Sequence, residues 1–174
     1  TYVPGDDVDC SVLCHEGDIL AYTIQTGFIP RAGTYMAPAG IRFVYDEQVI
    51  AIVRKLVAVT GFNGVMHLDM RRSAVDGSVQ IIEANLRYWA SIVGSLTVGV
   101  NFPQLACLAA LNQSFDRPRF ATRKFVDTTA ALRHWVRRDL DKPRQSYSYA
   151  ETGIRFALRD PLAEMAKWVR RLIG

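Results

Sequence analysis

The segment Gly64–Ile92 constrains the fold more than any other part of the chain. It reads GVMHLDMRRSAVDGSVQIIEANLRYWASI and predicts two strands joined by a turn at Asp76-Gly77. Side chains alternate between the two faces of a strand, so Glu83 and Asn85 point the same way. Asp69 lies on the first strand and can face them across the turn. We therefore expect two carboxylates and one amide oxygen to converge on one face of a sheet.

This set of side chains predicts a metal site. Asp69, Glu83 and Asn85 offer hard oxygen ligands, which suit Mg²⁺ held between protein and nucleotide phosphates. Arg87 occupies the next position on the same face, where its guanidinium could hold a negatively charged reacting group. The alternative is a hairpin with a merely solvated polar end, which would need no asparagine between two charged residues.

A second hairpin is expected at the start of the chain. Val8, Cys10 and Val12 alternate with Asp9 and Ser11, which lie on the opposite face of the same predicted strand. A turn at residues 15–18 then leads into the apolar run at residues 19–24. The next stretch, 26–45, is irregular. It reads TGFIPRAGTYMAPAGIRFVY, in which Arg42 is expected on a strand and Arg31 in a loop.

Four segments show helical signals. Residues 46–60 have apolar side chains at helical spacing, with Asp46 as the expected N-cap and Gly61 as the end. Residues 101–112 start near Phe102-Pro103, and proline suits a first helical turn. Residues 128–140 and the segment from Asp160 onward are also amphipathic. The stretch 115–123 between them is expected to be a connector.

Composition indicates a folded globular protein. The chain has 174 residues, of which 49% are hydrophobic and 22% charged, so it can bury a sizeable core as one large domain or slightly more. The net charge of +4 arises partly from arginines in the last third. Nucleic-acid binding is one interpretation, but no aromatic-basic stacking motif accompanies the arginines. A solvated helix face or an anion-attracting cleft is therefore the favoured interpretation.

Cysteine usage and hydropathy indicate a compartment. Cys10, Cys14 and Cys107 do not form a disulfide framework and are expected to be reduced, which favours a cytoplasmic location. No apolar stretch reaches the length of a membrane span, and no signal peptide is visible. The expectation is a cytoplasmic protein without a membrane partner.

The hairpin of the first paragraph resembles the metal-binding end of ATP-grasp ligases, the superfamily of D-alanine–D-alanine ligase, biotin carboxylase and carbamoyl-phosphate synthetase. The family pattern is an acidic residue on one strand, a turn, and then Glu-x-Asn, often followed by x-Arg. Here it is formed by Asp69, Asp76-Gly77 and the run Glu83–Arg87. The resemblance covers residues 1–112, the second half of an ATP-grasp domain, and implies an α+β fold: an antiparallel sheet flanked by helices. Residues 113–174 would be a basic, mainly helical extension.

The resemblance also implies roles for residues outside the metal site. The pattern Gly5-Asp6-Asp7 resembles the family element in which the acidic residue at the position of Asp7 binds the ribose hydroxyls; the alternative is an ordinary turn residue. Ile82 would pack against the adenine, or else would be a core isoleucine. Arg42 would meet the phosphates or an acyl phosphate, with Arg31 as a less favoured candidate. Arg87 would stabilise the acyl phosphate or hold the incoming carboxylate.

The implied activity is ATP-dependent, Mg²⁺-requiring ligation, with Mn²⁺ as an alternative metal. A small carboxylate would attack the γ-phosphate, giving an acyl phosphate and ADP, and an amine or similar nucleophile would then displace phosphate. The family's adenine-binding hinge and phosphate-binding lysines would precede Thr1, so the chain alone is expected to be inactive. A non-catalytic binding or regulatory module and a nucleic-acid binder remain the alternatives, and a homodimer remains open.

Overall fold

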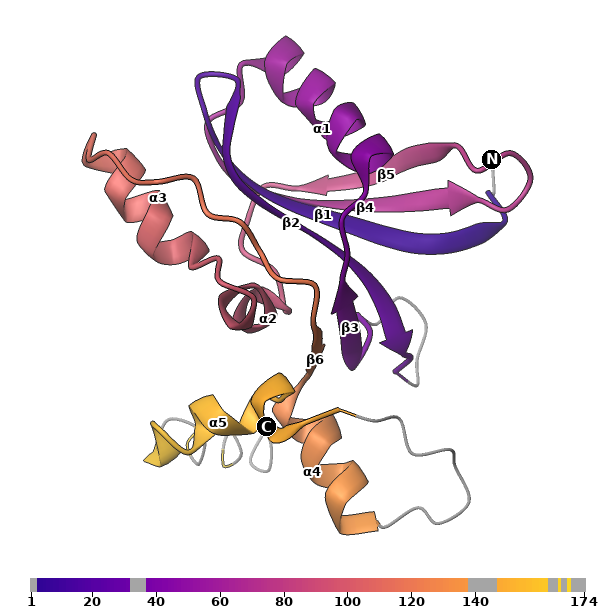
Figure 1. Ribbon diagram of the computed structural model, residues 1–174, viewed down its shortest axis with the longest axis vertical. Coiled ribbons are helices and arrows are strands. Elements are labelled where there is room, and N and C mark those ends of the chain that lie inside the picture. The colour runs from indigo at the N-terminus through magenta and orange to yellow at the C-terminus, as the bar shows by residue number, and fades with distance from the viewer. Residues whose placement is uncertain (1–2, 32–36, 138–146, 163–165, 167–168, 170–174) are drawn as a thin grey trace.

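One antiparallel sheet organises the molecule, as the computed structural model in Figure 1 shows. The structure describes residues 3–31, 37–137, 147–162, 166 and 169. The strand order is β5-β4-β1-β2-β3-β6. The strands are β1 (Gly5–His15), β2 (Asp18–Ile29), β3 (Gly40–Phe43), β4 (Gly64–Ser73), β5 (Val79–Asn85) and β6 (Lys124–Val126). This arrangement confirms the expected α+β class with an antiparallel sheet.

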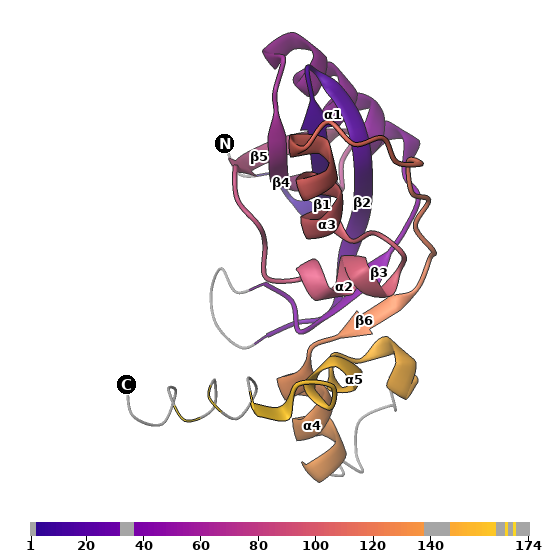
Figure 2. The same ribbon diagram turned by 90° about the vertical axis from the view of Figure 1, so that its left-hand side faces the viewer.

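Helices cover both faces of the sheet. Helix α1 (Glu47–Thr60) packs on one face, and α2 (Ile92–Thr97) and α3 (Phe102–Ala110) lie on the other (Figures 1 and 2). Each face therefore has its own apolar core. The core under α1 contains Cys10, Ile24, Val53 and Leu68 among others, and the core under α3 contains Leu13, Phe43, Phe102 and Phe125. The alternation of side chains along β1 supplies both cores from a single strand.

The first hairpin forms where the sequence predicts it. β1 and β2 are joined at Glu16-Gly17, and both residues have positive φ, 48° and 81°. Two positive φ angles are the signature of the tight hairpin turn whose twist matches that of the strands. Cys10 and Cys14 are buried and Cys107 is exposed, and all three are free thiols, as expected.

The helix predicted after Asp46 is confirmed at both ends. The Asp46 carboxylate accepts hydrogen bonds from the backbone N–H groups of Gln48 and Val49, each at 3.1 Å. Gly61 ends the helix in the left-handed conformation, with φ of 59°. Asp46 also forms an ion pair with Arg72 at the end of β4, so the cap joins the helix to the sheet.

The second hairpin places the predicted ligands opposite one another. In the antiparallel pairing of β4 with β5, Asp69 lies opposite Glu83, and His67 lies opposite Asn85. Next along the strands, Met70 pairs with Ile81, so Ile82 is an extra residue at a bulge. The helix predicted after Asn101 is also confirmed, because α3 begins at Phe102 with Asn101 as its N-cap.

The sequence did not predict every element. No helix was predicted for the stretch that α2 occupies, and β6 pairs with β3 although only a connector was expected nearby. β6 has three residues, which is too short for an alternating pattern to be recognised. The sheet therefore extends beyond residue 112, where the sequence placed the end of the ATP-grasp part. That domain boundary remains a prediction.

Short helices after β6 lie beside it. Helix α4 (Thr128–Arg137), a 3-10 helix (Tyr149–Glu151) and α5 (Ile154–Ala157) lie at that edge of the sheet (Figure 1). The helix predicted from Asp160 falls largely outside the described residues. Within the described part of the chain, no helix combines the length and the apolar character needed to cross a bilayer.

The cap of α1 can be tested by Asp46→Ala. This change removes two hydrogen bonds to the first turn and the ion pair with Arg72, so the free energy of unfolding should fall by about 1–2 kcal/mol. Urea denaturation measures the loss. Glu47→Ala is the control, because Glu47 is exposed and lies in the same first turn, whereas Asp46 provides the cap. Equal losses in the two variants would contradict the capping role.

Candidate functional site

A band of polar side chains lies on the sheet face that α2 and α3 cover. Residues paired across neighbouring strands point to the same face of a sheet. The register pairs Gln25 with Asp9, Asp9 with Asp69, and Asp69 with Glu83, so their side chains form one band. We call this band the polar face. Its members are Asp9, Ser11, Thr23, Gln25, His67, Asp69, Glu83 and Asn85. Four strands therefore contribute to one surface.

The predicted metal ligands meet on the polar face. The side-chain amide of Asn85 donates to Asp69 Oδ2 at 3.1 Å, and Arg87 Nη2 donates to Asn85 Oδ1 at 3.4 Å. Glu83 is exposed and lies directly across from Asp69 in the register. The structure thus brings Asp69, Asn85 and Arg87 into one chain of hydrogen bonds, with Glu83 beside it.

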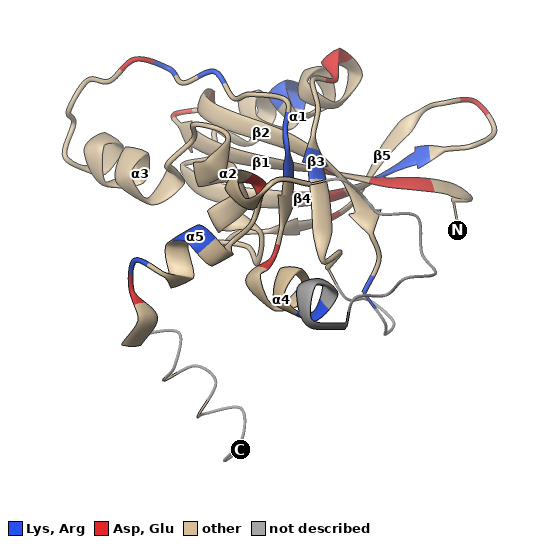
Figure 3. Cartoon of the chain, turned by 60° about the horizontal axis from the view of Figure 1, so that its bottom comes forward, with Lys and Arg blue, Asp and Glu red and all other residues tan. Residues whose placement is uncertain are grey.

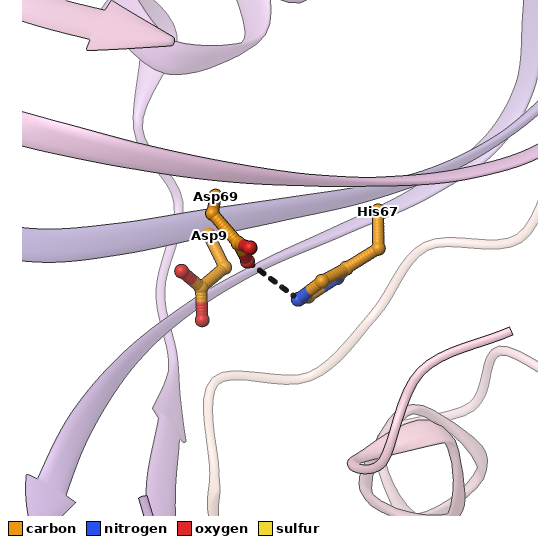
Figure 4. A group of neighbouring side chains, drawn as sticks. All are labelled: Asp9, His67 and Asp69. Carbon is orange, nitrogen blue, oxygen red and sulfur yellow. Dashed lines mark ion pairs between the residues drawn. The ribbon is translucent and has the colours of Figure 1, made fainter. Parts of the chain in front are cut away.

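His67 joins this group from the position before Asp69 on the same face. Its Nε2 lies 3.3 Å from Asp69 Oδ1, and its Nδ1 lies 2.8 Å from the hydroxyl of Ser11 (Figure 4). The imidazole also stacks on the indole of Trp89, with ring centroids 5.4 Å apart and an angle of 12° between the planes. His67 is therefore held on three sides.

Asp9 is the least solvated carboxylate of the polar face. It accepts a hydrogen bond from the Gln25 amide at 3.1 Å, and Gln25 in turn accepts one from Ser91 at 3.0 Å. Burial raises the pKa of Asp9 from 3.8 to about 6, against the opposing effects of the Gln25 hydrogen bond and of His67. Nearby Asp69 adds to the increase.

Three of these side chains form a possible ligand group that the sequence reasoning missed. One ligand atom each from Asp9, His67 and Asp69 can be chosen so that all lie within 4.8 Å of one another. The signal was present, because Asp9 was placed on the face opposite Val8 and Cys10, and His67 lies two residues before Asp69 on the same face of its strand. What the sequence could not supply was the pairing of β1 with β4, which aligns Asp9 with Asp69.

Trp89 contributes a further feature. It is 5% exposed, packed edge-on against Phe102 and stacked on His67. Its Nε1–H is buried and has no acceptor among the residues that the structure describes. An unpaired buried donor costs about 1–3 kcal/mol, so it is a costly feature to retain.

Two predicted nucleotide contacts lie at the periphery. The side chain of Asp7 is 74% exposed and pairs with Arg71 at 2.5 Å. Figure 3 shows the acidic start of β1 beside the basic end of β4. Ile82 is 61% exposed at the bulge in β5 and belongs to neither core. Their roles toward ribose and adenine remain predictions, and both side chains are accessible to a ligand.

The structure does not bring Arg42 to the metal ligands. Its neighbour Phe43 pairs with Gln25 and lies on the α3 side of the sheet, so Arg42 points to the α1 side. There it lines an open pocket with Arg123 and Lys124. Arg31, the less favoured candidate, forms an ion pair with Asp127.

The donor set of the polar face fits Mg²⁺. Carboxylate and amide oxygens are its preferred protein ligands, and Asp69, Glu83 and Asn85 provide both kinds. Rotation of the Asn85 amide by half a turn would exchange its oxygen and nitrogen and direct the oxygen toward Asp69. The residues present can therefore hold the metal that the sequence implies.

Comparisons with known proteins place this fold. No family model matches the sequence, and no curated protein matches it. Among solved structures, phosphoribosylglycinamide synthetase from Anaerococcus prevotii matches with a TM-score of 0.52 and 20% identity, over 65% of this chain and 30% of its own. N5-carboxyaminoimidazole synthetase from Staphylococcus aureus, complexed with ADP, matches with a TM-score of 0.52 and 14% identity, over 67% of this chain and 32% of its own. A biotin carboxylase–ATP complex from Campylobacter jejuni matches with a TM-score of 0.51 and 13% identity, over 68% of this chain and 28% of its own.

These matches confirm the fold. Biotin carboxylase is a member of the superfamily that the hairpin sequence resembles, and the chain has an ATP-grasp fold. The chain spans between 28% and 32% of the length of these three structures. At identities of 20% or less, the similarity establishes the fold and leaves the activity to be inferred from the site.

The raised pKa of Asp9 predicts a pH-dependent stability. Between pH 3.8 and about 6 the folded chain holds a proton that the unfolded chain has lost, so the folded state loses this advantage as pH rises through 6. Asp9→Asn removes the ionisation. The variant should therefore gain stability relative to wild type above pH 6, by on the order of 2 kcal/mol, compared with pH 4.

Thermal unfolding at a series of pH values measures this difference. Asp116→Asn is the control, because Asp116 is exposed and its replacement should have the same small effect at every pH. A constant difference between Asp9→Asn and wild type from pH 4 to pH 8 would show that Asp9 is not destabilised by burial.

Proposed function

We propose that this chain carries the metal-binding and acceptor-binding part of an ATP-dependent ligase, one that activates a small carboxylate as an acyl phosphate and joins it to an amine or similar nucleophile. The observation that carries the proposal is the hydrogen-bonded sequence Asp69–Asn85–Arg87, with Glu83 across from Asp69. In this group, carboxylate and amide oxygens lie next to a guanidinium at the exposed end of the polar face. ATP with Mg²⁺ is the proposed cofactor pair, and Mn²⁺ could replace Mg²⁺.

Each residue has a task in this chemistry. Asp69, Glu83 and Asn85 would hold Mg²⁺, which, when bound, neutralises charge on the β- and γ-phosphates. Arg87 would orient the carboxylate or its phosphorylated form through the planar fork of its guanidinium. Its Nη2 already contacts Asn85, so the group that it holds would lie beside the metal ligands. Positioning and charge neutralisation supply most of the rate in phosphoryl transfer.

Exposure supports placing the substrates at the Glu83–Arg87 end of the polar face. Glu83 and Arg87 are exposed, whereas Asp9 and His67 are largely covered. A substrate can therefore reach the Glu83 and Arg87 side chains from solvent. Asp7 on β1 and Ile82 on β5 also have accessible side chains, which is compatible with ribose and adenine contacts.

The proposal predicts the effect of Glu83→Gln in the full-length protein. The change keeps the shape of the side chain and removes the charge that would bind Mg²⁺, so turnover should fall by about 100-fold or more. Steady-state kinetics measure turnover, and thermal unfolding checks that the fold is intact. Glu47→Gln on α1 is the matched control. Near-normal turnover in a folded Glu83→Gln protein would remove Glu83 from the metal site.

Arg87→Lys tests the acceptor role. Lysine keeps the charge but cannot reproduce the paired N–H groups of the guanidinium. We expect a large fall in turnover, with the affinity for ATP changed much less, because Arg87 contacts the metal-ligand end of the site. An exposed surface arginine would tolerate the change, as Arg54→Lys on α1 should. A loss confined to ATP affinity would reassign Arg87 to the nucleotide.

A further inference from the structure

We infer that Asp9, His67 and Asp69 form a second cation site, selective for a divalent first-row transition metal such as Zn²⁺ over Mg²⁺. The site lies deeper on the polar face than Glu83 and shares Asp69 with the proposed magnesium site (Figure 4). It does not depend on the proposed ligase activity, because two of its three ligands have no part in that proposal.

The geometry of the donor atoms carries this inference. Candidate ligand atoms of Asp9, His67 and Asp69 lie within 4.8 Å of one another, which a single ion can span. They come from two neighbouring strands whose register aligns Asp9 with Asp69, so their backbone positions are set by the ladder. In Figure 4 the carboxylates and the imidazole edge converge on the same side of the sheet.

His67 is oriented as a metal-binding histidine would be. One ring nitrogen, Nε2, lies on the carboxylate side, and the other, Nδ1, lies 2.8 Å from Ser11 Oγ. Ligating histidines commonly donate their second ring N–H to an oxygen acceptor, which fixes the tautomer with a free lone pair toward the metal. A serine–histidine–aspartate hydrolase is the competing interpretation. Ser11 is 0% exposed, so its hydroxyl cannot reach a substrate and serves to orient the ring.

The surrounding side chains hold this arrangement in place. Gln25 donates to one oxygen of Asp9 and is itself held by Ser91, so that the carboxylate is positioned by α2 as well as by the sheet. The indole of Trp89 stacks on His67, and its buried Nε1–H has no acceptor among the described residues. This donor is an observation independent of the three ligands, and an acceptor near the indole would satisfy it.

The chemistry of the ligands determines the class of metal. Imidazole nitrogen suits zinc, copper, iron or nickel, whereas Mg²⁺ prefers oxygen ligands and retains its water. The Glu83–Asn85 end of the polar face offers oxygen alone, and the Asp9–His67 end offers nitrogen with oxygen. The two ends should therefore discriminate between the two kinds of ion.

Isothermal titration of the full chain with Zn²⁺, in an excess of Mg²⁺, tests the site. Wild type should bind one Zn²⁺. His67→Gln should weaken binding by more than the roughly 10–100-fold expected for Ser11→Ala, which removes only the orienting partner. His15→Gln is the matched control, since His15 lies at the far end of β1. Glu83→Gln separates the two sites and should leave the Zn²⁺ affinity unchanged.

Three results would overturn the inference: no Zn²⁺ binding by wild type in excess Mg²⁺, equal affinity in wild type and His67→Gln, or a Glu83→Gln loss as large as that of His67→Gln. The last result would mean that zinc occupies the magnesium site. Failure of the proposed ligase activity would leave all these measurements unaffected.

A measurement on the wild-type chain covers the case in which His67→Gln does not fold. Zn²⁺ bound at Nε2 should shift the ring ¹⁵N resonances of His67 in the NMR spectrum, and His15→Gln assists their assignment. Unchanged His67 resonances at saturating Zn²⁺ would overturn the inference.

Discussion

The antiparallel register of β1, β4 and β5 is the constraint on which the rest of the site depends. It aligns Asp9 with Asp69 and Asp69 with Glu83, three carboxylates in a row across neighbouring strands. Cross-strand neighbours on one face lie about 5 Å apart, so such a row is electrostatically unfavourable unless cations or hydrogen-bond donors intervene. The chain supplies Gln25, His67 and Asn85 as those intervening groups. A shift of the register by one residue would send these side chains into the apolar core under α1.

This arrangement places stability and function in opposition. Asp9 is buried enough for its pKa to rise to about 6, and Trp89 buries an N–H without an acceptor among the described residues. Both features cost folding free energy. The opposite face carries no such cost, because Cys10, Leu68 and the apolar side of α1 form a closed hydrophobic layer there. The core under α1 is thus apolar, whereas the face under α2 and α3 combines an apolar core with the polar groups for which we propose a binding role.

Asp69 links the two cation sites that we propose. Toward the solvent it contacts Asn85, next to Glu83 and Arg87, and toward the interior it contacts His67. A ligand bound at one end would change the charge experienced at the other through this shared carboxylate. The two proposed sites also differ in their access to solvent, since Glu83 is exposed and the side chain of His67 is only 12% exposed.

Local sequence signals determined the elements that have a strong local cause. The Asp46 cap, the Gly61 end and the two hairpins were predictable because capping, positive φ and strand alternation act over a few residues. The Glu83–Arg87 pattern likewise indicated one face and one kind of ligand. Tertiary structure alone decided that Asp9 and His67 join Asp69, that Arg42 lies on the opposite face, and that β6 closes the sheet edge. Those outcomes depend on pairing between strands that are distant along the chain, and the free energy of that pairing comes from burying both cores together, which no short segment records.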